Sequence, residues 1–193
     1  MISDPLSENM ISKHQYTLSK HQDTLLKHQD TLSNKQDKIY SYSLDEAKKS
    51  NLLFKHGCVA TYGGHIVASG YNTHKNYSSN DNFIDNQCSF HAEMDVLRKI
   101  YWRTKNKRKQ RRMMKRTKLY ISRASNSGSS TNSAPCVKCL QMIQNFNIRK
   151  IVFCMDDHYY QYNPQDYQTD HVTFGELALM KRNYSQKTPL ELL

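Results

Sequence analysis

The stretch Pro135-Cys136-Val137-Lys138-Cys139 decides how this chain is interpreted. Two cysteines three residues apart at the start of a helix place both sulfur atoms on one side of a helical turn. A second stretch, His91-Ala92-Glu93, supplies a histidine that can act as a third ligand. Three protein ligands leave one position of a tetrahedral zinc ion open, which is typical of catalytic rather than structural sites. The two stretches together therefore predict an open zinc site.

The composition favours a single intracellular domain with polar additions. Hydrophobic residues make up 37% of the 193 residues and the mean hydropathy is −0.82, so we expect part of the chain to lie outside a packed core. The longest purely apolar run, residues 151–155, is too short to span a bilayer, and no N-terminal stretch resembles a secretory signal. Five cysteines, an odd number, favour reduced thiols. We expect a cytoplasmic location and no membrane partner.

Residues 1–42 carry a seven-residue repeat. The repeat places one apolar residue in each copy, at Leu18, Leu25, Leu32 and Ile39. A coiled coil needs two such positions per heptad, and the threonine that recurs in each copy is a mediocre helix former. We therefore expect a low-complexity tail, either solvated or forming a helical oligomerisation segment.

Residues 43–184 predict one α/β domain of three layers, with a mixed central sheet and helices on both faces. The expected helices cover residues 44–54, 89–101, 135–146 and 175–184. The expected strands cover residues 57–62, 66–71, 119–122, 150–154 and 172–174. Residues 185–193 are expected to form a C-terminal tail.

Local signals set these boundaries. Ser43 followed by Glu46 has the pattern of a capping box at a helix start. Gly63-Gly64 separates two apolar stretches and predicts a tight hairpin turn. Pro135 suits the first turn of a helix, where its missing N–H has no intrahelical partner to lose. The unbroken apolar run at residues 150–154 predicts a central strand in a parallel arrangement.

The expected ligands suit a hydrolytic reaction. Both ligand groups stand at expected helix N-termini, where the partial positive charge favours the thiolate form of cysteine. Zinc lowers the pKa of a bound water to about 7. Glu93, two residues after the histidine, can take a proton from that water and pass it to a ring nitrogen and a leaving amine. This set of groups predicts removal of an amino group from an aromatic ring.

The two stretches resemble the signature of the zinc-dependent cytidine and deoxycytidylate deaminase superfamily. The resemblance covers residues 50–155, and it includes Gly70-Tyr71-Asn72 and residues 148–153. It implies that Zn²⁺ is held by His91, Cys136 and Cys139. It also implies that Glu93 is the proton shuttle, and that the Asn72 side chain and the Ala92 backbone contact the substrate.

Residues 98–118 depart from a plain member of this superfamily, and Cys88 leaves two interpretations open. Residues 98–118 are densely basic and contain no acid, in a chain whose formal net charge is +11. This basic segment is either a solvated helix extension, a surface for phosphate or nucleic acid, or a nuclear localisation signal at residues 107–112. Cys88 either joins His74 in a second metal site or is a buried structural thiol.

The expected function is hydrolytic deamination of a cytosine nucleoside or nucleotide to its uracil form, with release of ammonia. Two alternatives stay open. The chain could act on a base in RNA or DNA, or it could be a catalytically silent binding protein of the same fold. The intact Glu93 argues against the silent protein, because such a site has no need of a proton shuttle. Members of the superfamily tend to assemble, so a homo-oligomer is expected as well.

Overall fold

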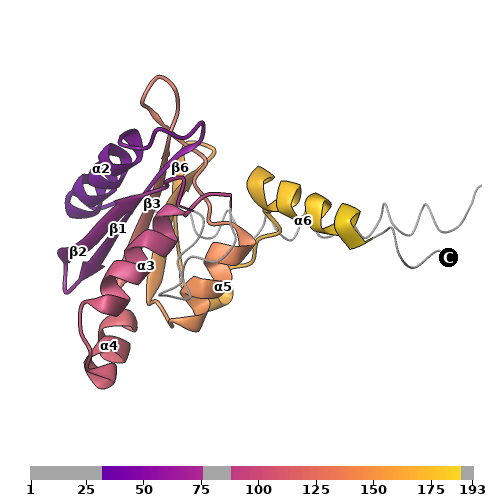
Figure 1. Cartoon of the computed structure of the whole chain (residues 1–193). Helices are drawn as coiled ribbons and strands as arrows, with labels where there is room; N and C mark the ends of the chain where they lie inside the picture. The colour runs from indigo at the N-terminus through magenta and orange to yellow at the C-terminus, as the bar shows by residue number, and fades with distance from the viewer. Residues whose placement is uncertain (1–31, 76–87, 188–193) are drawn as a thin grey trace, which may run out of the picture.

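The computed structural model of the chain describes residues 32–75 and 88–187, and its centre is one mixed sheet (Figure 1). The strands run in the order β2-β1-β3-β5-β6, with β4 paired to β3. Only the β3–β5 pair is parallel, and the other pairs are antiparallel. The strands are β1 (Lys55–Tyr62), β2 (His65–Tyr71), β3 (Lys118–Ala124), β4 (Ser130–Thr131), β5 (Lys150–Met155) and β6 (His158–Tyr162).

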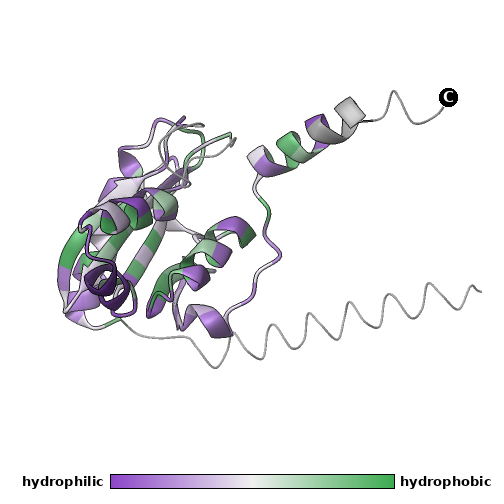
Figure 2. Cartoon of the chain, turned by 60° about the horizontal axis from the view of Figure 1, so that its bottom comes forward, coloured by the Kyte–Doolittle hydropathy of each residue, from purple (hydrophilic) through white to green (hydrophobic). Residues whose placement is uncertain are grey.

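Helices cover both faces of this sheet, as expected (Figure 1). One face carries α2 (Asn34–Lys48), and the other carries α3 (Ala92–Trp102) and α5 (Val137–Asn145). The short helix α4 (Lys107–Met114) follows α3 and is among the most hydrophilic parts of the ribbon (Figure 2). A 3-10 turn, η1 (Pro164–Asp166), and α6 (Phe174–Lys187) complete the described elements. The three-layer α/β fold is thus confirmed.

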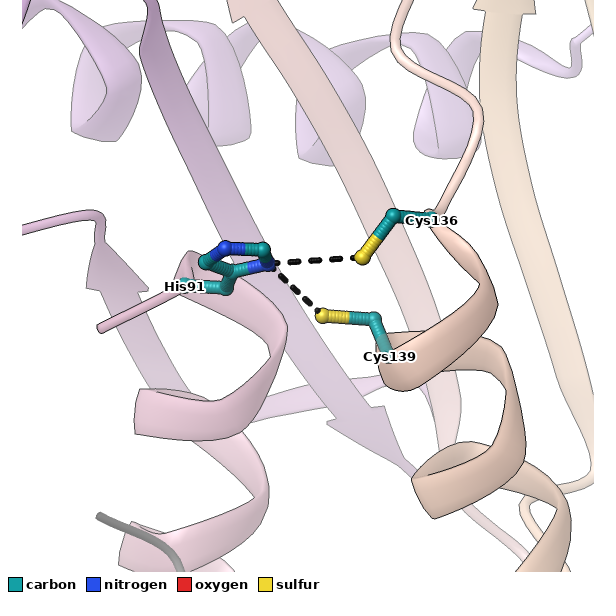
Figure 3. Close-up of side chains that lie close together, drawn as sticks. All are labelled: His91, Cys136 and Cys139. Carbon is teal, nitrogen blue, oxygen red and sulfur yellow. Dashed lines mark hydrogen bonds between the residues drawn. The ribbon is translucent and has the colours of Figure 1, made fainter. Parts of the chain in front are cut away.

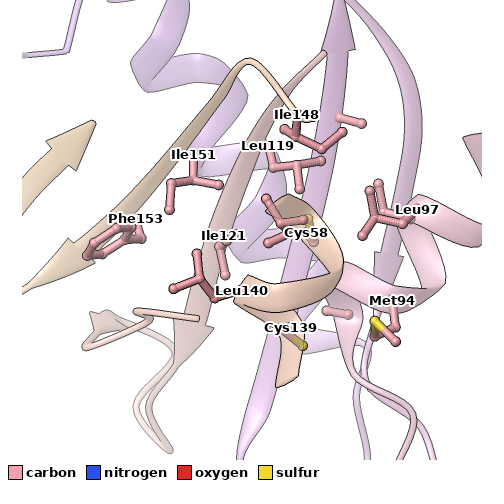
Figure 4. Packing of buried hydrophobic residues seen from close by; sticks show 14 of the residues in the cluster. Cys58, Met94, Leu97, Leu119, Ile121, Cys139, Leu140, Ile148, Ile151 and Phe153 are labelled. Carbon is pink, nitrogen blue, oxygen red and sulfur yellow. The ribbon is translucent and has the colours of Figure 1, made fainter. Parts of the chain in front are cut away.

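Alternation along the strands builds a core on each face of the sheet. In β3, Leu119 and Ile121 point toward α3 and α5, whereas Tyr120 points toward α2. The larger cluster, on the α3 and α5 face, is drawn in Figure 4. Because successive strand side chains point to opposite faces, one strand sequence serves both cores.

The first helix begins ten residues earlier than expected, at Asn34 rather than at residue 44. Ser33 is its N-cap, because the Ser33 hydroxyl accepts from the Gln36 N–H and the Gln36 side chain accepts from the Ser33 N–H. This is a complete capping box. Ser43 instead lies inside α2, fully buried, and its hydroxyl donates to the carbonyl of Tyr40 at 2.7 Å. The Ser43–Glu46 pattern was therefore wrong as a helix start, since both residues belong to the packed middle of α2.

The last copy of the heptad repeat packs on the sheet. Ile39 and Tyr40 are buried in the α2 core, and Leu32 packs against the same cluster. The two apolar repeat positions that the structure describes thus face β-strands of this chain. Residues 1–31 and 188–193 lie outside the described residues, so a separate tail at either end stays a prediction. Of the expected tail segments, residues 34–42 belong to α2 and residues 185–187 to α6.

The end of α2 also differs from the prediction. The helix stops at Lys48, and Leu53 is 79% exposed. The reason lies in Asn72, whose amide nitrogen donates to the carbonyl of Phe54 at 2.6 Å and whose amide oxygen accepts from the N–H of His56 at 2.8 Å. These two bonds hold residues 54–56 in an extended course and lead them into β1.

The prediction from the sequence is wrong for the C-terminal part of the domain. No strand forms at residues 172–174, because Phe174 is the first residue of α6. The strand at this edge of the sheet is β6, which was not predicted. Its Tyr160 and Tyr162 stack on Phe153 of β5, with ring centroids 6.0 and 5.9 Å apart. Aromatic packing across the strands therefore determines this strand.

The expected hairpin is confirmed. Gly63 and Gly64 both have positive φ angles, 59° and 80°, and they join β1 to β2. Within the two described ranges, no helix is both long and apolar enough to cross a membrane.

Gly57 marks the closest approach of α2 to the sheet, and it supplies a test of this packing. A Cβ atom at Gly57 would meet the carbonyl oxygen of Ser43 and the backbone nitrogen of Ala47. We expect Gly57→Ala to lower the free energy of unfolding by roughly 1–3 kcal/mol, because backbone atoms cannot move aside as a flexible side chain can. Urea denaturation would measure the loss. Gly63→Ala is the control, because a Cβ there meets nothing and only its positive φ angle, at about 1 kcal/mol, opposes it. An equal or larger loss in the control would contradict the close approach.

Candidate metal centre and active site

Three side chains meet at the starts of α3 and α5, as the sequence predicted (Figure 3). His91 Nδ1 lies 3.2 Å from Cys139 Sγ and 3.5 Å from Cys136 Sγ. The three ligand atoms all lie within 4.8 Å of one another. In the described ranges this is the one group of three or more histidine, cysteine or acidic residues that could hold a metal ion.

Two helix N-termini bring these groups together. His91 is the N-cap of α3, Cys136 is the N-cap of α5, and Cys139 lies in the first turn of α5. Neither cap residue uses its side chain to cap its helix, so both side chains stay available to a ligand. Pro135 lies just before the N-cap, so its expected place in the first helical turn was wrong by one or two residues.

Ser133 fixes the approach to Cys136. Its hydroxyl donates to the carbonyl of Ile121 in β3 at 2.9 Å and accepts from the N–H of Cys154 in β5 at 3.0 Å. Its own N–H donates to the carbonyl of Cys154 at 2.8 Å. These bonds tie the chain before α5 to two neighbouring strands, which sets where the cysteines stand.

A short β-bridge fixes the start of α3 in the same way. Thr73 and Phe90 exchange two backbone hydrogen bonds, of 3.0 and 2.9 Å. Thr73 follows Asn72 at the end of β2, and Phe90 precedes His91. The bridge therefore keeps His91 close to the end of β2.

The hydrogen bond between the two cysteine side chains shifts their pKa values in opposite directions. The hydrogen bond with Cys139 lowers the pKa of Cys136 to about 4, and the hydrogen bond with His91 adds to this effect. The pKa of Cys139 is raised, first by that same hydrogen bond to Cys136 and then by burial. Burial alone would lower the pKa of His91, but its hydrogen bond with Cys136 and the charge of that sulfur raise it overall. The site thus already favours a thiolate, the form that binds metals.

Glu93 lies directly beside this cluster. Its side chain is only 5% exposed and is hydrogen-bonded to the Cys139 side chain. Burial, followed by the charge of Cys136, raises the pKa of the Glu93 carboxyl. A raised pKa makes a buried carboxyl a better proton acceptor, which is the property expected of a group that transfers protons.

The donor set fits zinc. One imidazole nitrogen and two sulfur atoms suit a borderline-soft ion, and the fourth tetrahedral position would remain for a non-protein ligand. No further cysteine, histidine or carboxylate completes the set within the described residues, which is the arrangement of an open site.

A pocket opens over the cluster, and several of its lining residues were not predicted. Beside Asn72, His91, Glu93 and Cys136, its wall includes Phe54, His56, His171, Thr173 and Phe174. Burial lowers the pKa of His56 to about 4, so this imidazole is neutral at neutral pH. His56 was recognisable as a histidine at the start of a strand next to the one that ends in Asn72. Nothing in the sequence pointed to residues 171–174.

The C-terminal segment forms one wall of this pocket through three contacts. The carbonyl of His171 accepts from the N–H of Val137 at 3.0 Å, which satisfies a free donor at the start of α5. Lys138 and Glu176 form an ion pair at 3.3 Å. The Cys88 thiol donates to the carbonyl of Gly175 at 3.2 Å. The segment therefore touches the chain on both sides of the cluster.

Of the two expected substrate contacts, Asn72 lines the pocket, whereas Ala92 is not among its described lining residues. Asn72 lines it, is 6% exposed, and uses both ends of its amide to hold residues 54–56. Ala92 is fully buried in the first turn of α3, where backbone N–H groups lack intrahelical partners.

The sequence expectation for Cys88 needs correction. Cys88 is exposed rather than a buried thiol, and it forms no second metal site with His74 among the residues described. The basic segment lies away from the pocket. Its helix α4 follows the C-terminal end of α3, and His91 caps the opposite end, about 16 Å away along an eleven-residue helix.

A three-layer α/β domain with a His-Cys-Cys cluster at two helix N-termini defines a zinc-binding deaminase domain. The family profile of the cytidine and deoxycytidylate deaminase zinc-binding region matches residues 33–155, and this chain belongs to that family. The metal of the cluster is accordingly Zn²⁺.

Two solved structures are similar to this chain. The crystal structure of dCMP deaminase from the cyanophage S-TIM5 in apo form is 18% identical, with a TM-score of 0.44. The same enzyme in complex with dCMP and dUMP is 17% identical, with a TM-score of 0.43. In both cases the similarity covers 63% of this chain and 82% of the other. None of the curated proteins matches this chain.

The cluster predicts about one zinc ion per chain. We expect His91→Ala and Cys136→Ala each to reduce the zinc content to near zero, because two remaining ligands hold the ion weakly. Cys88→Ser should keep the full content, since this exposed thiol lies outside the cluster. Metal analysis of the purified, folded proteins would measure this. A folded wild-type protein purified with zinc present but free of the metal would contradict the assignment.

Proposed function

We propose that this chain hydrolyses the amino group of a cytosine nucleoside or nucleotide, giving the uracil form and ammonia. His91, Cys136 and Cys139 would hold the zinc ion. Glu93 would carry the proton, and Asn72 and Ala92 would contact the substrate. The observation that carries the proposal is the buried carboxyl of Glu93, hydrogen-bonded to a cluster sulfur at the inner end of a pocket.

Glu93 accounts for the proton transfers that the reaction needs. Zinc, when bound, supplies an activated water as the nucleophile at neutral pH. The Glu93 carboxylate takes one proton as the water adds to the amino-bearing ring carbon, and it passes that proton to the neighbouring ring nitrogen. The same carboxyl then carries a second proton to the amino group, which leaves as ammonia. A raised pKa suits this work, because the group must both accept and release a proton.

The rest of the pocket is suited to a flat, neutral ring. Phe54 and Phe174 contribute aromatic side chains to its wall, and His56 contributes an uncharged imidazole. The amide of Asn72 is held rigidly by its two backbone bonds. It retains one N–H and one oxygen lone pair for a substrate, since an amide can make up to four hydrogen bonds.

The alternative of a base in RNA or DNA has weaker support. The basic segment would have to guide the polymer, but α4 follows the end of α3 that is remote from His91. The aromatic residues of that segment, Tyr101 and Trp102, stand at its start, so stacking residues do not alternate with the cations. The alternative of a silent binding protein does not account for a buried Glu93.

A substrate panel tests the proposal. The zinc-loaded chain would be incubated with cytidine, deoxycytidine, their monophosphates, cytosine, and short RNA and DNA oligomers. Mass spectrometry would follow the replacement of the amino group by oxygen. Turnover of a monomeric substrate supports the proposal. Turnover of oligomers alone, falling steeply with salt, would favour the nucleic-acid alternative. An inert panel would favour the silent protein.

The role of Glu93 can be tested separately from zinc binding. We expect Glu93→Gln to keep its zinc and to lower kcat by about 10²–10⁴-fold, because the amide cannot transfer protons. Ammonia release and zinc content would be measured on the same sample. Glu46→Gln is the matched control, since Glu46 is an equally buried carboxylate that pairs with Lys49 elsewhere. Unchanged turnover in Glu93→Gln would reject the assigned role.

Arg123 supplies a test of the phosphate state. Among the described lining residues of the pocket there is no lysine or arginine, but the Arg123 guanidinium lies 4.8 Å from the ring centroid of Phe54, which is in the pocket wall. We expect Arg123→Met to lower kcat/KM for dCMP by about tenfold and to spare deoxycytidine, since one charge-assisted bond to phosphate is lost. Steady-state kinetics on both substrates would measure the ratio, with Arg112→Met on α4 as control. Equal losses for both substrates would show that Arg123 does not recognise phosphate.

A further inference from the structure

A second cavity lies on the α2 face of the sheet. Its volume is about 430 Å³, which is within the range of small-ligand sites. Four cationic side chains line it: Lys35, Arg116, Lys118 and Arg149. We call it the cationic cavity. The α2 helix, the turn before β3 and the turn before β5 each contribute to it, so residues far apart in the sequence converge here.

The cationic cavity is separate from the zinc cluster. Lys118 is the first residue of β3, whereas Arg123, beside the Phe54 ring at the zinc pocket, lies near the other end of that strand. Five residues of extended chain span about 17 Å. The hairpin residues Gly63 and Gly64, at the far end of β1, also line the cavity. The two sites thus lie at opposite ends of strands β1 and β3.

The charges of the cavity are not neutralised by the described part of the chain. The ion pairs found there join Lys48 to Asp45, Lys49 to Glu46, Lys99 to Asp95 and Lys138 to Glu176, and none involves a cavity residue. The sequence from residue 96 to residue 155 contains no aspartate or glutamate at all. Arg116, Lys118 and Arg149 therefore have no acidic neighbour in this stretch of the chain, and no described ion pair involves Lys35.

Like charges are close enough here to affect one another. The pKa of Lys118 is lowered, first by partial burial and then by the positive charges of Lys150 and Arg149. Assembling these groups costs free energy that a bound anion would recover. The positive end of α2 adds to the same field, because that helix begins at Asn34 beside the cavity.

The walls favour phosphate groups over a nucleobase. The one aromatic residue among the described lining is Tyr120, which is 2% exposed and so offers no face for stacking. Gly64 leaves room for a cation: a Cβ atom there would come within 2.9 Å of the Lys35 ammonium. A single phosphate could contact only some of four cations around a cavity of this size, whereas a chain of phosphates can reach several.

We propose that the cationic cavity binds a polyphosphate group, either as an inorganic chain or as the phosphate moiety of a nucleotide. A nucleic-acid backbone fits this concave site less well. It would instead be expected to use the exposed cations of α4, such as Arg108 and Arg112, which face solvent on a convex helix. The proposal does not depend on the deaminase activity, because the cationic cavity and the zinc pocket lie at opposite ends of β1 and β3.

Calorimetric titration of the full zinc-loaded chain with inorganic tripolyphosphate tests the proposal, in a phosphate-free buffer of low ionic strength. We expect one binding event per chain. The double variant Lys118→Met/Arg149→Met should weaken it by at least about tenfold, because two charge-assisted bonds are lost. The double variant Arg108→Met/Arg112→Met removes the same net charge from α4 and should change the affinity by less than about twofold. Lys35→Met, on the exposed side of α2, serves as a second cavity variant if the first does not fold.

Further ligands separate the sources of the phosphate. Binding of a nucleoside triphosphate as tight as that of tripolyphosphate supports recognition of the phosphates alone. No binding of tripolyphosphate, or equal losses in the cavity and α4 variants, would overturn the proposal. Tighter binding of a single-stranded oligonucleotide that is lost in the α4 variant and kept in the cavity variant would overturn it in favour of a nucleic-acid surface.

Discussion

The hydrogen bonds of Ser133 are the constraint on which the rest of the site depends. The residue bridges the ends of β3 and β5 through Ile121 and Cys154, and the Tyr40 hydroxyl of α2 lies 3.4 Å from its hydroxyl. Two layers of the fold, the sheet and α2, therefore meet at one buried side chain, which lies just before α5 of the third layer. Because Cys136 follows three residues later, the position of the zinc ligands is set by strand pairing rather than by the loop itself.

The pocket is lined both by residues inside the family profile and by residues beyond it. The family profile ends at residue 155, so it includes the zinc ligands, Glu93 and Asn72. His171, Thr173 and Phe174 line the same pocket from beyond that limit. The pocket wall therefore comes from two parts of the chain, one inside the family profile and one beyond it.

Charge is distributed unevenly over the domain. The described lining of the zinc pocket is free of lysine and arginine, which suits a neutral ring. Cations gather instead in the cationic cavity and on α4. Lys118 and Arg123 lie about 17 Å apart along β3, so the charges of the cationic cavity are largely screened by salt at the end of β3 near the zinc pocket. No residue of the basic segment is among the described lining of the zinc pocket.

The sequence by itself determined the chemistry of the site and the layered class of the fold. A histidine and two cysteines at helix starts specify a metal by their chemical nature, and the hairpin follows from Gly63-Gly64, because both signals are local. Tertiary structure alone decided which of two capping patterns begins α2, since burial of Ile39 and Tyr40 on the sheet selects Ser33 over Ser43. It also decided β6 and the C-terminal wall, because aromatic packing across strands and a hydrogen bond from Val137 to His171 join residues that no local pattern connects.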